Sequence, residues 1–528
     1  MMARLLEEDL GRRRRDERRG GRSAMNGAAL SMMGLALACG LLLSACTGGE
    51  KASVQETGIS AGDDSESTAE TADSAPCEST PDTGRLNTCE DMDAPAPEDN
   101  PDLCDQQLPC VRSVKRCGTV EDQWAGWSLG SEMVGHPQLP AAAGDYGYEG
   151  PMAVYLVEDV ASSGWLDGDV VIGGDVTTAT AGFGHSIATG ADLDGDSLPD
   201  LAVGAPYVSN HHTWEGAILI YDGPTFAGDT PEDPDANIHG GYYEDYLGNA
   251  LAPVSDVNDD GYDELLAGVS NSDWEYTVSR FFLGPVGPDT DVDDAAAVWY
   301  STETSPGDVT VAVDMTGDGV AELLLSDAFH QDRSAVWILD AEDRGVIDLA
   351  DGSQGVFGTS DALILGWSMS AGDATGDGYA DIVIDMAGQR IDDGVRLWGV
   401  VMAGPLPEST SVLSAVAQYE QFADEDYWNS TAVVGDVDGD GSPGDVLVAI
   451  PGTRGIHLLP SPLCGTYELD RHTQLTGAET TDAFLGRSIV PLPDVDGDGY
   501  DDVLIAAPFD DEGAPDAGAV YTLFGGSW

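Results

Sequence analysis

Short apolar runs, separated by turns rich in glycine and acidic residues, recur along the chain from residue 183 onward. The copy that begins at 183 opens on Phe-Gly-His-Ser, passes through an acidic stretch and the Ala-Pro pair of 205–206, and reaches the apolar run 216–221; the last copy, from 485, repeats this order. Helical periodicity is weak throughout. The pattern predicts four strands per repeat: one before the acidic loop, one after it that ends near the Ala-Pro pair, and two more.

The repeat has a regular length. The first aspartate of the acidic loop stands at 192, 256, 314, 373, 436 and 494, so one unit spans about 60 residues, which is typical of a propeller or a solenoid. A degenerate copy precedes these six, because 134–137 aligns with 203–206 and 150–155 matches the later Gly-Ala-Val-Tyr strand. In this copy the loop aspartates are replaced by Gln123, Ala125, Trp127 and Ser131. We therefore expect an all-β protein with seven repeats, while six or eight remain alternatives.

These motifs together resemble the FG-GAP repeat of integrin α-subunit propellers, and bacterial secreted proteins carry similar repeats. The resemblance covers about residues 118–528. It implies a seven-bladed β-propeller over 104–528, in which the first blade, 118–182, is degenerate. It also assigns the acidic loops to Ca²⁺.

The acidic loop follows the pattern D-x-[DNT]-x-D-[GS]-x-x-[DE]. Side-chain oxygens at positions 1, 3, 5 and 9 and the backbone carbonyl of position 7 form a hard oxygen donor set that suits Ca²⁺, and the loops contain no His or Cys that would favour zinc. The alternative is a set of acidic turns that hold no metal. About six calcium sites are predicted, with these ligands: Asp192, Asp194, Asp196, Leu198, Asp200; Asp256, Asn258, Asp260, Tyr262, Glu264; Asp314, Thr316, Asp318, Val320, Glu322; Asp373, Thr375, Asp377, Tyr379, Asp381; Asp436, Asp438, Asp440, Asp445; Asp494, Asp496, Asp498, Tyr500, Asp502.

The six loops differ in how well they match the pattern. The loop that begins at Asp494 fits best, whereas the loop at Asp192 has Ser197 where glycine is expected. The loop at Asp436 is irregular, because position 9 is Gly444 and the carboxylate of Asp445 comes one residue late. Its closure around a metal is therefore an open question.

Charge excludes one class of function. The 528 residues include 95 acidic and 21 basic side chains, a formal net charge of −74, and the only lysines are Lys51 and Lys115. A nucleic-acid partner is therefore not expected, since such proteins need a basic surface. The hydrophobic share of 42% is that of a chain with a core. The excess acidity indicates a solvated surface, with a cationic partner as the alternative.

The N-terminus has the pattern of an export signal. Eight arginines before residue 23 are followed by an apolar run at 28–45. The end of that run, Leu-Ser-Ala-Cys at 43–46, resembles the bacterial lipoprotein signal, which implies cleavage before Cys46 and a lipid on that cysteine. We expect a signal peptide at 1–45, a disordered, cysteine-containing tether at 46–103, and a protein anchored to the bacterial envelope, at the outer membrane or the cell surface. An uncleaved anchor or a plain secretory signal is the alternative, and Met25 is an alternative start.

The last repeat stops after its third strand, so a fourth must come from elsewhere. The integrin-like family closes its ring with an N-terminal strand, and here the candidate lies between Cys104 and Val120. In an exported chain the cysteines read as disulfide partners. We expect Cys464 to pair with Cys110 or Cys117, and the others, Cys77, Cys89 and Cys104 among them, to pair locally.

No catalytic constellation stands out. The segment 126–130 fits the G-x-S-x-G pattern around Ser128, but that pattern needs a strand-to-helix turn over a parallel sheet, which this region does not predict. We expect a monomeric binding, adhesion or structural module with a protein or glycan ligand and membrane contact only through the Cys46 lipid. The alternative is an extracellular, hydrolase-like enzyme that uses a propeller face or the central channel. Aromatic residues at matching repeat positions are expected to pack between blades: Tyr155, Tyr221, Trp337, Trp398 and Tyr521.

Overall fold

The computed structural model of the chain describes residues 112–117, 125, 127–130, 133–136, 152–156, 164–165, 170–174, 181–223, 233–269, 277–288, 290–301, 307–327, 334–349, 354–358, 364–391, 394–406, 409–423, 430–450, 455–469, 473–476, 484–511 and 517–526. The predicted signal peptide 1–45, the lipidation site Cys46 and the tether 46–103 lie outside these residues, so they stay predictions. Within the described ranges, no helix has the length and apolar character that a membrane span needs.

The described strands form seven sheets, which we number in chain order. Sheet 1 contains β2 (Ser128–Gly130), β3 (Met133–His136), β4 (Met152–Leu156) and β6 (Val170–Gly174); sheet 2 contains β7 (Ser186–Ala191), β8 (Asp200–Gly204), β9 (Ala217–Tyr221) and β10 (Ala236–His239); sheet 3 contains β11 (Ala250–Val254), β12 (Glu264–Gly268), β13 (Thr277–Phe282) and β14 (Ala297–Ser301); sheet 4 contains β15 (Thr310–Val313), β16 (Glu322–Asp327), β17 (Ala335–Asp340) and β19 (Gln354–Phe357).

Sheet 5 contains β20 (Ile364–Gly372), β21 (Asp381–Ile391), β22 (Gly394–Met402) and β24 (Ala417–Ala423); sheet 6 contains β25 (Ser430–Val433), β26 (Val446–Ile450), β27 (Gly455–Leu459) and β29 (Thr473–Thr476); sheet 7 contains β30 (Ile489–Leu492), β31 (Asp502–Ala507), β32 (Ala519–Leu523) and β1 (Ser113–Cys117). Two short 3₁₀ helices, Val292–Asp294 and Val412–Ser414, lie in connections. The predicted order of strands within a repeat, with the acidic loop between the first and second strands, is confirmed.

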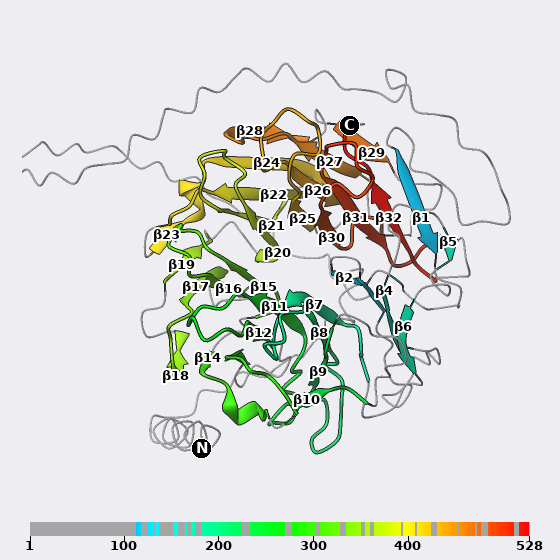
Figure 1. Cartoon of the computed structure of the whole chain (residues 1–528). Helices are drawn as coiled ribbons and strands as arrows, with labels where there is room; N and C mark the ends of the chain where they lie inside the picture. Colours follow the sequence, from blue (N-terminus) through cyan, green and yellow to red (C-terminus); the bar gives the residue numbers. More distant parts are fainter. Residues whose placement is uncertain are drawn as a thin grey trace, which may run out of the picture.

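The sheets are arranged around a central axis as a β-propeller (Figure 1). The first strands of successive sheets contact one another in the order β2, β7, β11, β15, β20, β25 and β30, and β30 contacts β2. The second strands are buried on both faces, as β8, β12 and β26 show, which is why they read as continuous apolar runs rather than alternating ones.

The core lies between the sheets. The buried apolar residues of the described part form seven clusters, and each joins two neighbouring sheets. Tyr221, Trp337 and Tyr521 are buried in such clusters, and Trp398 packs against another, as predicted. The side chain of Tyr155 lies outside the described residues. Each sheet thus depends on its neighbours for burial, as expected of a repeat protein.

The predicted closing strand is present. β1 pairs antiparallel with β32 and becomes the fourth strand of sheet 7 (blue beside red in Figure 1). Lys115 of β1 is 1% exposed, and its Nζ donates to both carboxylate oxygens of Asp510 at 2.9 Å. β1 therefore covers the edge of β32 and carries a buried ion pair into the sheet.

The predicted pairing of Cys464 is wrong. Cys464 is a free thiol, and Cys117 is bonded to a cysteine that lies outside the described residues. The turn that carries Cys464 lies against sheet 5, because Leu463 N–H donates to the Ala374 carbonyl at 2.8 Å. Cys117 lies on sheet 7, on the other side of sheet 6, so the two thiols face different neighbours.

Four short strands were not predicted. Each leaves its own repeat between the third and fourth strands and pairs in parallel with the outer strand of another sheet. They are β5 (Gly164–Trp165) on β1, β18 (Gly345–Asp348) on β14, β23 (Ser409–Ser411) on β19 and β28 (Gly465–Glu468) on β24. These strands cover edges that would otherwise expose unpaired backbone groups.

Candidate metal centre

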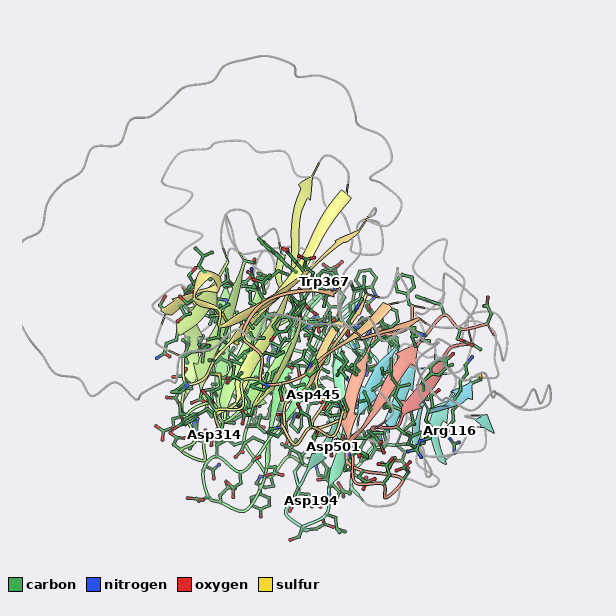
Figure 2. All side chains as sticks on the ribbon, turned by 90° about the horizontal axis from the view of Figure 1, so that it is seen from above. Arg116, Asp194, Asp314, Trp367, Asp445 and Asp501 are labelled. Atoms are coloured by element: carbon green, nitrogen blue, oxygen red, sulfur yellow. The ribbon has the colours of Figure 1, made fainter. Side chains whose placement is uncertain are left out.

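All six acidic loops lie on one face of the propeller. Each follows the first strand of its sheet and leads into the second, so the common strand direction brings the loops to the same end. Figure 2 shows Asp194, Asp314 and Asp501 along this face and Trp367 on the opposite one. We call this side the loop face.

Each loop folds around its first aspartate. In the first loop, Asp192 Oδ1 accepts from Gly195 N–H at 2.8 Å and Asp192 Oδ2 accepts from Ser197 N–H at 2.9 Å. The last loop repeats this arrangement at Asp494. Position 6 adopts a positive φ, 97° at Gly499 and 69° at Ser197, which explains why glycine predominates there.

The last acidic residue of each loop is the most buried. Asp200 is 3% exposed; its Oδ2 accepts from Leu193 N–H at 2.8 Å and its Oδ1 from Gly223 N–H at 3.0 Å. Burial raises the pKa of Glu264 to about 7 and that of Asp445 to about 7. In contrast, the backbone N–H of Gly261 holds the pKa of the half-buried Asp256 below its usual value. The loop at Asp256 therefore combines a first carboxylate of lowered pKa with a buried last carboxylate whose pKa is raised.

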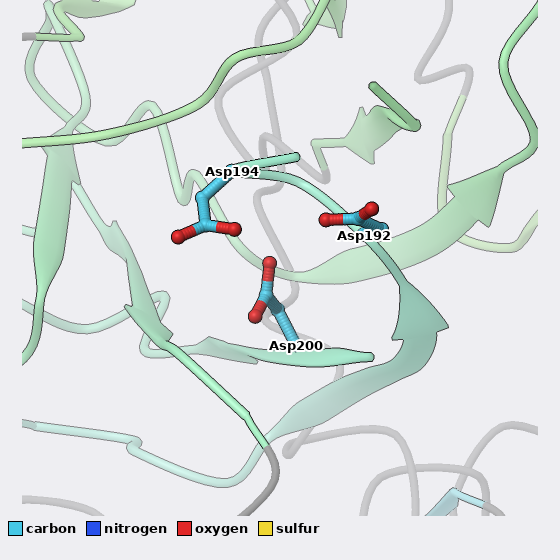
Figure 3. A group of neighbouring side chains, drawn as sticks. All are labelled: Asp192, Asp194 and Asp200. Carbon is cyan, nitrogen blue, oxygen red and sulfur yellow. The ribbon is translucent and has the colours of Figure 1, made fainter. Parts of the chain in front are cut away.

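Four loops bring three carboxylates together, with one oxygen from each lying within 4.8 Å of the others. Figure 3 shows the first of these groups, whose side chains point toward one another. The groups are Asp192, Asp194 and Asp200; Asp256, Asp260 and Glu264; Asp436, Asp438 and Asp445; and Asp494, Asp496 and Asp502. Among the described residues, the loops at Asp314 and Asp373, which have threonine at position 3, form no group of this kind.

The irregular loop closes through Asp445. Its Oδ2 accepts from Val437 N–H at 3.1 Å, the bond that position 9 makes in the loops at Asp192, Asp256, Asp314 and Asp494, and it joins the carboxylate group of Asp436 and Asp438. The extra residue, Gly444, passes close to the preceding loop, since a Cβ there would lie 1.8 Å from the carbonyl oxygen of Asp373. Because glycine has no side chain, the backbone at Gly444 can approach the Asp373 carbonyl, and the carboxylate of Asp445 then reaches the loop from one residue further along the chain.

The donor set fits a hard divalent cation. All the side-chain donors are oxygens, and oxygens that lie within 4.8 Å of one another are close enough to share one Ca²⁺ at about 2.4 Å from each. Six to eight oxygen ligands are usual for Ca²⁺, and position 7 of each loop can add a backbone carbonyl. Oxygen donors in a flexible loop favour calcium over zinc.

Arg112 contacts the last loop, a feature that the sequence did not reveal. Its Nη2 donates to Asp498 Oδ2 at 2.7 Å and also to Asp496 Oδ2, and its guanidinium lies 4.6 Å from the ring centroid of Phe524. Arg112 stands directly before β1, so the closing strand delivers a positive charge to two predicted ligands.

Arg112→Gln should therefore raise the metal affinity of the loop at Asp494. A partly exposed ion pair contributes about 1 kcal/mol or less, so we expect a gain of up to about fivefold. Arg112→Lys, which keeps the charge, is the control. The midpoint of metal-dependent amide protection in 494–502 measures the effect, and equal midpoints for wild type and Arg112→Gln would show that the guanidinium does not compete.

Metal binding should weaken as the pH falls. The buried carboxyls of Glu264 and Asp445, with pKa values of about 7, must lose a proton to bind a cation. One pH unit below such a pKa only about a tenth of the group is ionised, which lowers affinity about tenfold. The stability of the metal-free fold changes with pH in the opposite direction. Glu264 and Asp445, whose pKa values are raised by folding, stabilise the metal-free fold at low pH, and this stabilisation is lost as the pH rises through about 7. The difference between melting midpoints in Ca²⁺ and in EDTA should thus shrink between about pH 7.5 and 5; a constant difference contradicts this.

Ser128, the centre of the G-x-S-x-G segment, takes part in a link between sheets. Its Oγ donates to the Gly184 carbonyl of sheet 2 at 2.8 Å. Ser186, which pairs with Gly204 as Ser128 pairs with Gly135, donates in the same way to the Gly248 carbonyl of sheet 3 at 2.8 Å. The serine thus belongs to the repeat pattern that joins neighbouring sheets. The predicted alignment of Gln123, Ala125, Trp127 and Ser131 with the acidic loop is therefore wrong, because Ser128–Gly130 form the first strand of sheet 1.

The sheets and the loop face define a β-propeller built from repeats that carry acidic loops between their first two strands. The chain contains FG-GAP repeats: the FG-GAP repeat model matches residues 183–221 and 485–523. Integrin alpha-PS2 of Drosophila melanogaster is 37% identical over 116 residues, 20% of this chain and 8% of that protein. Integrin alpha-7 of Homo sapiens is 35% identical over 122 residues, 22% of this chain and 9% of that protein.

The matched segments thus amount to less than a tenth of either integrin. Among solved structures, the WD40 domain of Toxoplasma gondii coronin aligns over 80% of this chain and 87% of that chain, at 11% identity and a TM-score of 0.39. A likeness of this size carries no argument about function.

Proposed function

We propose that this protein is a calcium-binding β-propeller of seven blades, one for each sheet, that acts as a binding or adhesion module at the bacterial envelope. The observation that carries the proposal is the set of acidic loops on one face. In four of these loops three carboxylates lie close together, with one oxygen from each within 4.8 Å of the others. The FG-GAP repeats and the similarity to integrin alpha chains support a module of the binding type.

In this proposal the two faces have different tasks. Bound Ca²⁺ orders the loop face and holds together the first and second strands of the blades that carry an acidic loop. The opposite face, where Trp367 lies, is left for a protein or glycan ligand (Figure 2). The lipid on Cys46 and the tether 46–103 would hold a monomeric propeller away from the membrane.

The test is retention of a ligand that depends on calcium. The purified chain, immobilised in Ca²⁺, is exposed to native envelope extract and then washed with EDTA; a specific set of proteins or glycans should elute. A variant with Asp192→Asn, Asp256→Asn and Asp494→Asn is the control and should retain little. Retention of the same set in EDTA from the start would contradict a calcium-dependent binding module.

Anchoring is tested separately. Growth with a labelled fatty acid should label the wild-type chain but not Cys46→Ser, and the variant should leave the membrane fraction. Equal labelling of both chains would contradict lipid attachment at Cys46.

A further inference from the structure

Three of the six loops carry a tyrosine at position 7, and each ring lies on the preceding loop. Tyr262, Tyr379 and Tyr500 contact the glycine at position 4 of the loop before them. A Cβ on Gly195 would lie 2.3 Å from the Tyr262 ring, one on Gly439 would lie 1.9 Å from the Tyr500 ring, and one on Gly317 would lie 3.4 Å from the Tyr379 ring. At Gly195 and Gly439 the absence of a Cβ therefore makes room for the tyrosine of the next loop, whereas at Gly317 the tyrosine ring lies at an ordinary van der Waals distance.

A second link joins two of these pairs of loops. Asp263 Oδ2 accepts from Asp192 N–H at 2.8 Å, its Oδ1 accepts from Asp256 N–H at 2.8 Å, and its own N–H donates to the Asp192 carbonyl at 2.9 Å. One side chain thus holds the first ligand residue of two successive loops. Asp501 contacts the first ligand residue of the preceding loop: its Oδ2 accepts from Asp436 N–H at 3.0 Å, and its own N–H donates to the Asp436 carbonyl at 3.2 Å.

The junctions between these pairs are built differently. At the junction between the loops at 256 and 314, position 7 is Val320 and position 8 is Ala321. At the junction between the loops at 373 and 436, the side chain nearest a Cβ on Gly376 is that of Pro462, and backbone meets backbone at Gly444. The tyrosine contacts therefore group the six loops as 192 with 256, 314 with 373, and 436 with 494.

The tyrosines connect this grouping to the ligand sets. Position 7 is the residue whose backbone carbonyl completes the proposed site, and Tyr262 N–H donates to the ligand Asp260 at 3.1 Å. A cation in the second loop of a pair would fix the tyrosine backbone, and the ring would then restrict the glycine between two ligands of the first loop. Ordering one loop reduces the entropy cost of ordering the other, which produces positive coupling.

We propose that the loops bind cations as three coupled pairs, in which Tyr262, Tyr379 and Tyr500 are positioning residues and Asp263 and Asp501 reinforce the coupling. The inference rests on the proposed function, since it requires that the loops hold metal. Binding in one loop of a pair raises the affinity of the other, and loops of different pairs respond independently.

Hydrogen exchange of the full chain, titrated with Ca²⁺, tests the coupling loop by loop. Asp256→Asn should move the midpoint of amide protection in 192–200 to a Ca²⁺ concentration about fivefold higher or more, the usual lower range of allosteric coupling. Asp314→Asn, in a different pair, is the matched control and should leave that midpoint unchanged. The pair at the other end gives an independent repeat, with Asp494→Asn read out in 436–445.

Tyr262→Leu separates coupling from simple loss of a site. In the Tyr262→Leu background both loops keep their ligands, but Asp256→Asn should shift the midpoint in 192–200 less than it does in the wild type. The control is Val320→Ala, at position 7 of an unpaired junction. In the Val320→Ala background Asp256→Asn should shift the midpoint as much as it does in the wild type. An unchanged midpoint in 192–200 on Asp256→Asn overturns the coupling. The absence of calcium-dependent protection from every loop of the wild type instead overturns the proposed function itself.

Discussion

Removal of calcium should lower the melting midpoint of this protein by about 10 °C or more. The four convergent carboxylate groups place like charges close together, so the metal-free loops oppose folding through repulsion. At ten times its dissociation constant, each independent site adds about 1.4 kcal/mol, and several such sites together are comparable to the stability of an ordinary domain. Melting curves in about 2 mM Ca²⁺ and in EDTA measure the difference.

Single-loop variants make this prediction specific. Asp498→Ala should lower the midpoint in Ca²⁺ more than Asp440→Ala does, because Asp498 belongs to the loop that fits the ligand pattern best, whereas Asp440 belongs to the loop whose last carboxylate comes one residue late. In EDTA the two variants should differ less. A melting midpoint that is the same with and without calcium would contradict the prediction that these loops hold a stabilising metal.

The second large effect is expected at the closing strand. A chain that starts at Leu103 should fold, whereas one that starts at Glu121 lacks β1 and should melt far lower or fail to fold. Without β1 the edge of β32 loses its partner, and Asp510 stays buried without the ammonium group of Lys115. Equal melting midpoints for the two chains would contradict a closing role for β1.

A point substitution tests the same strand without truncation. Lys115→Met leaves the Asp510 carboxylate without its cation and should cost about 3–5 kcal/mol. Adding Asp510→Leu replaces the pair by apolar side chains and should recover most of that loss. If Lys115→Met is neutral in denaturant unfolding, the buried pair does not stabilise the closed ring.

Within a repeat, the sequence was sufficient to predict structure. The acidic loop could be identified because its ligands lie within nine or ten residues of one another, so the local turn brings them together. The order of strands followed from apolar runs, since a strand buried on both faces carries an uninterrupted one, as β26 does. The closing strand was predictable because the last repeat lacked one strand and the integrin-like family, which the repeats resemble, closes its ring with an N-terminal strand.

Between repeats, only the tertiary structure could decide. The free thiol of Cys464 and the position of Arg112 on Asp498 depend on which face of a sheet meets which neighbour. Arg112 and Asp498 are 386 positions apart, and no local pattern reports a contact over such a separation.

The pairing of loops has the same origin. A tyrosine at position 7 and a glycine at position 4 each look like ordinary turn residues in the sequence. Their contact exists because the packing of adjacent sheets sets two loops side by side, so that the Tyr262 ring occupies the space where Gly195 has no side chain. Local chemistry thus determined where cations can bind, while the packing between sheets determined which of those sites can influence one another.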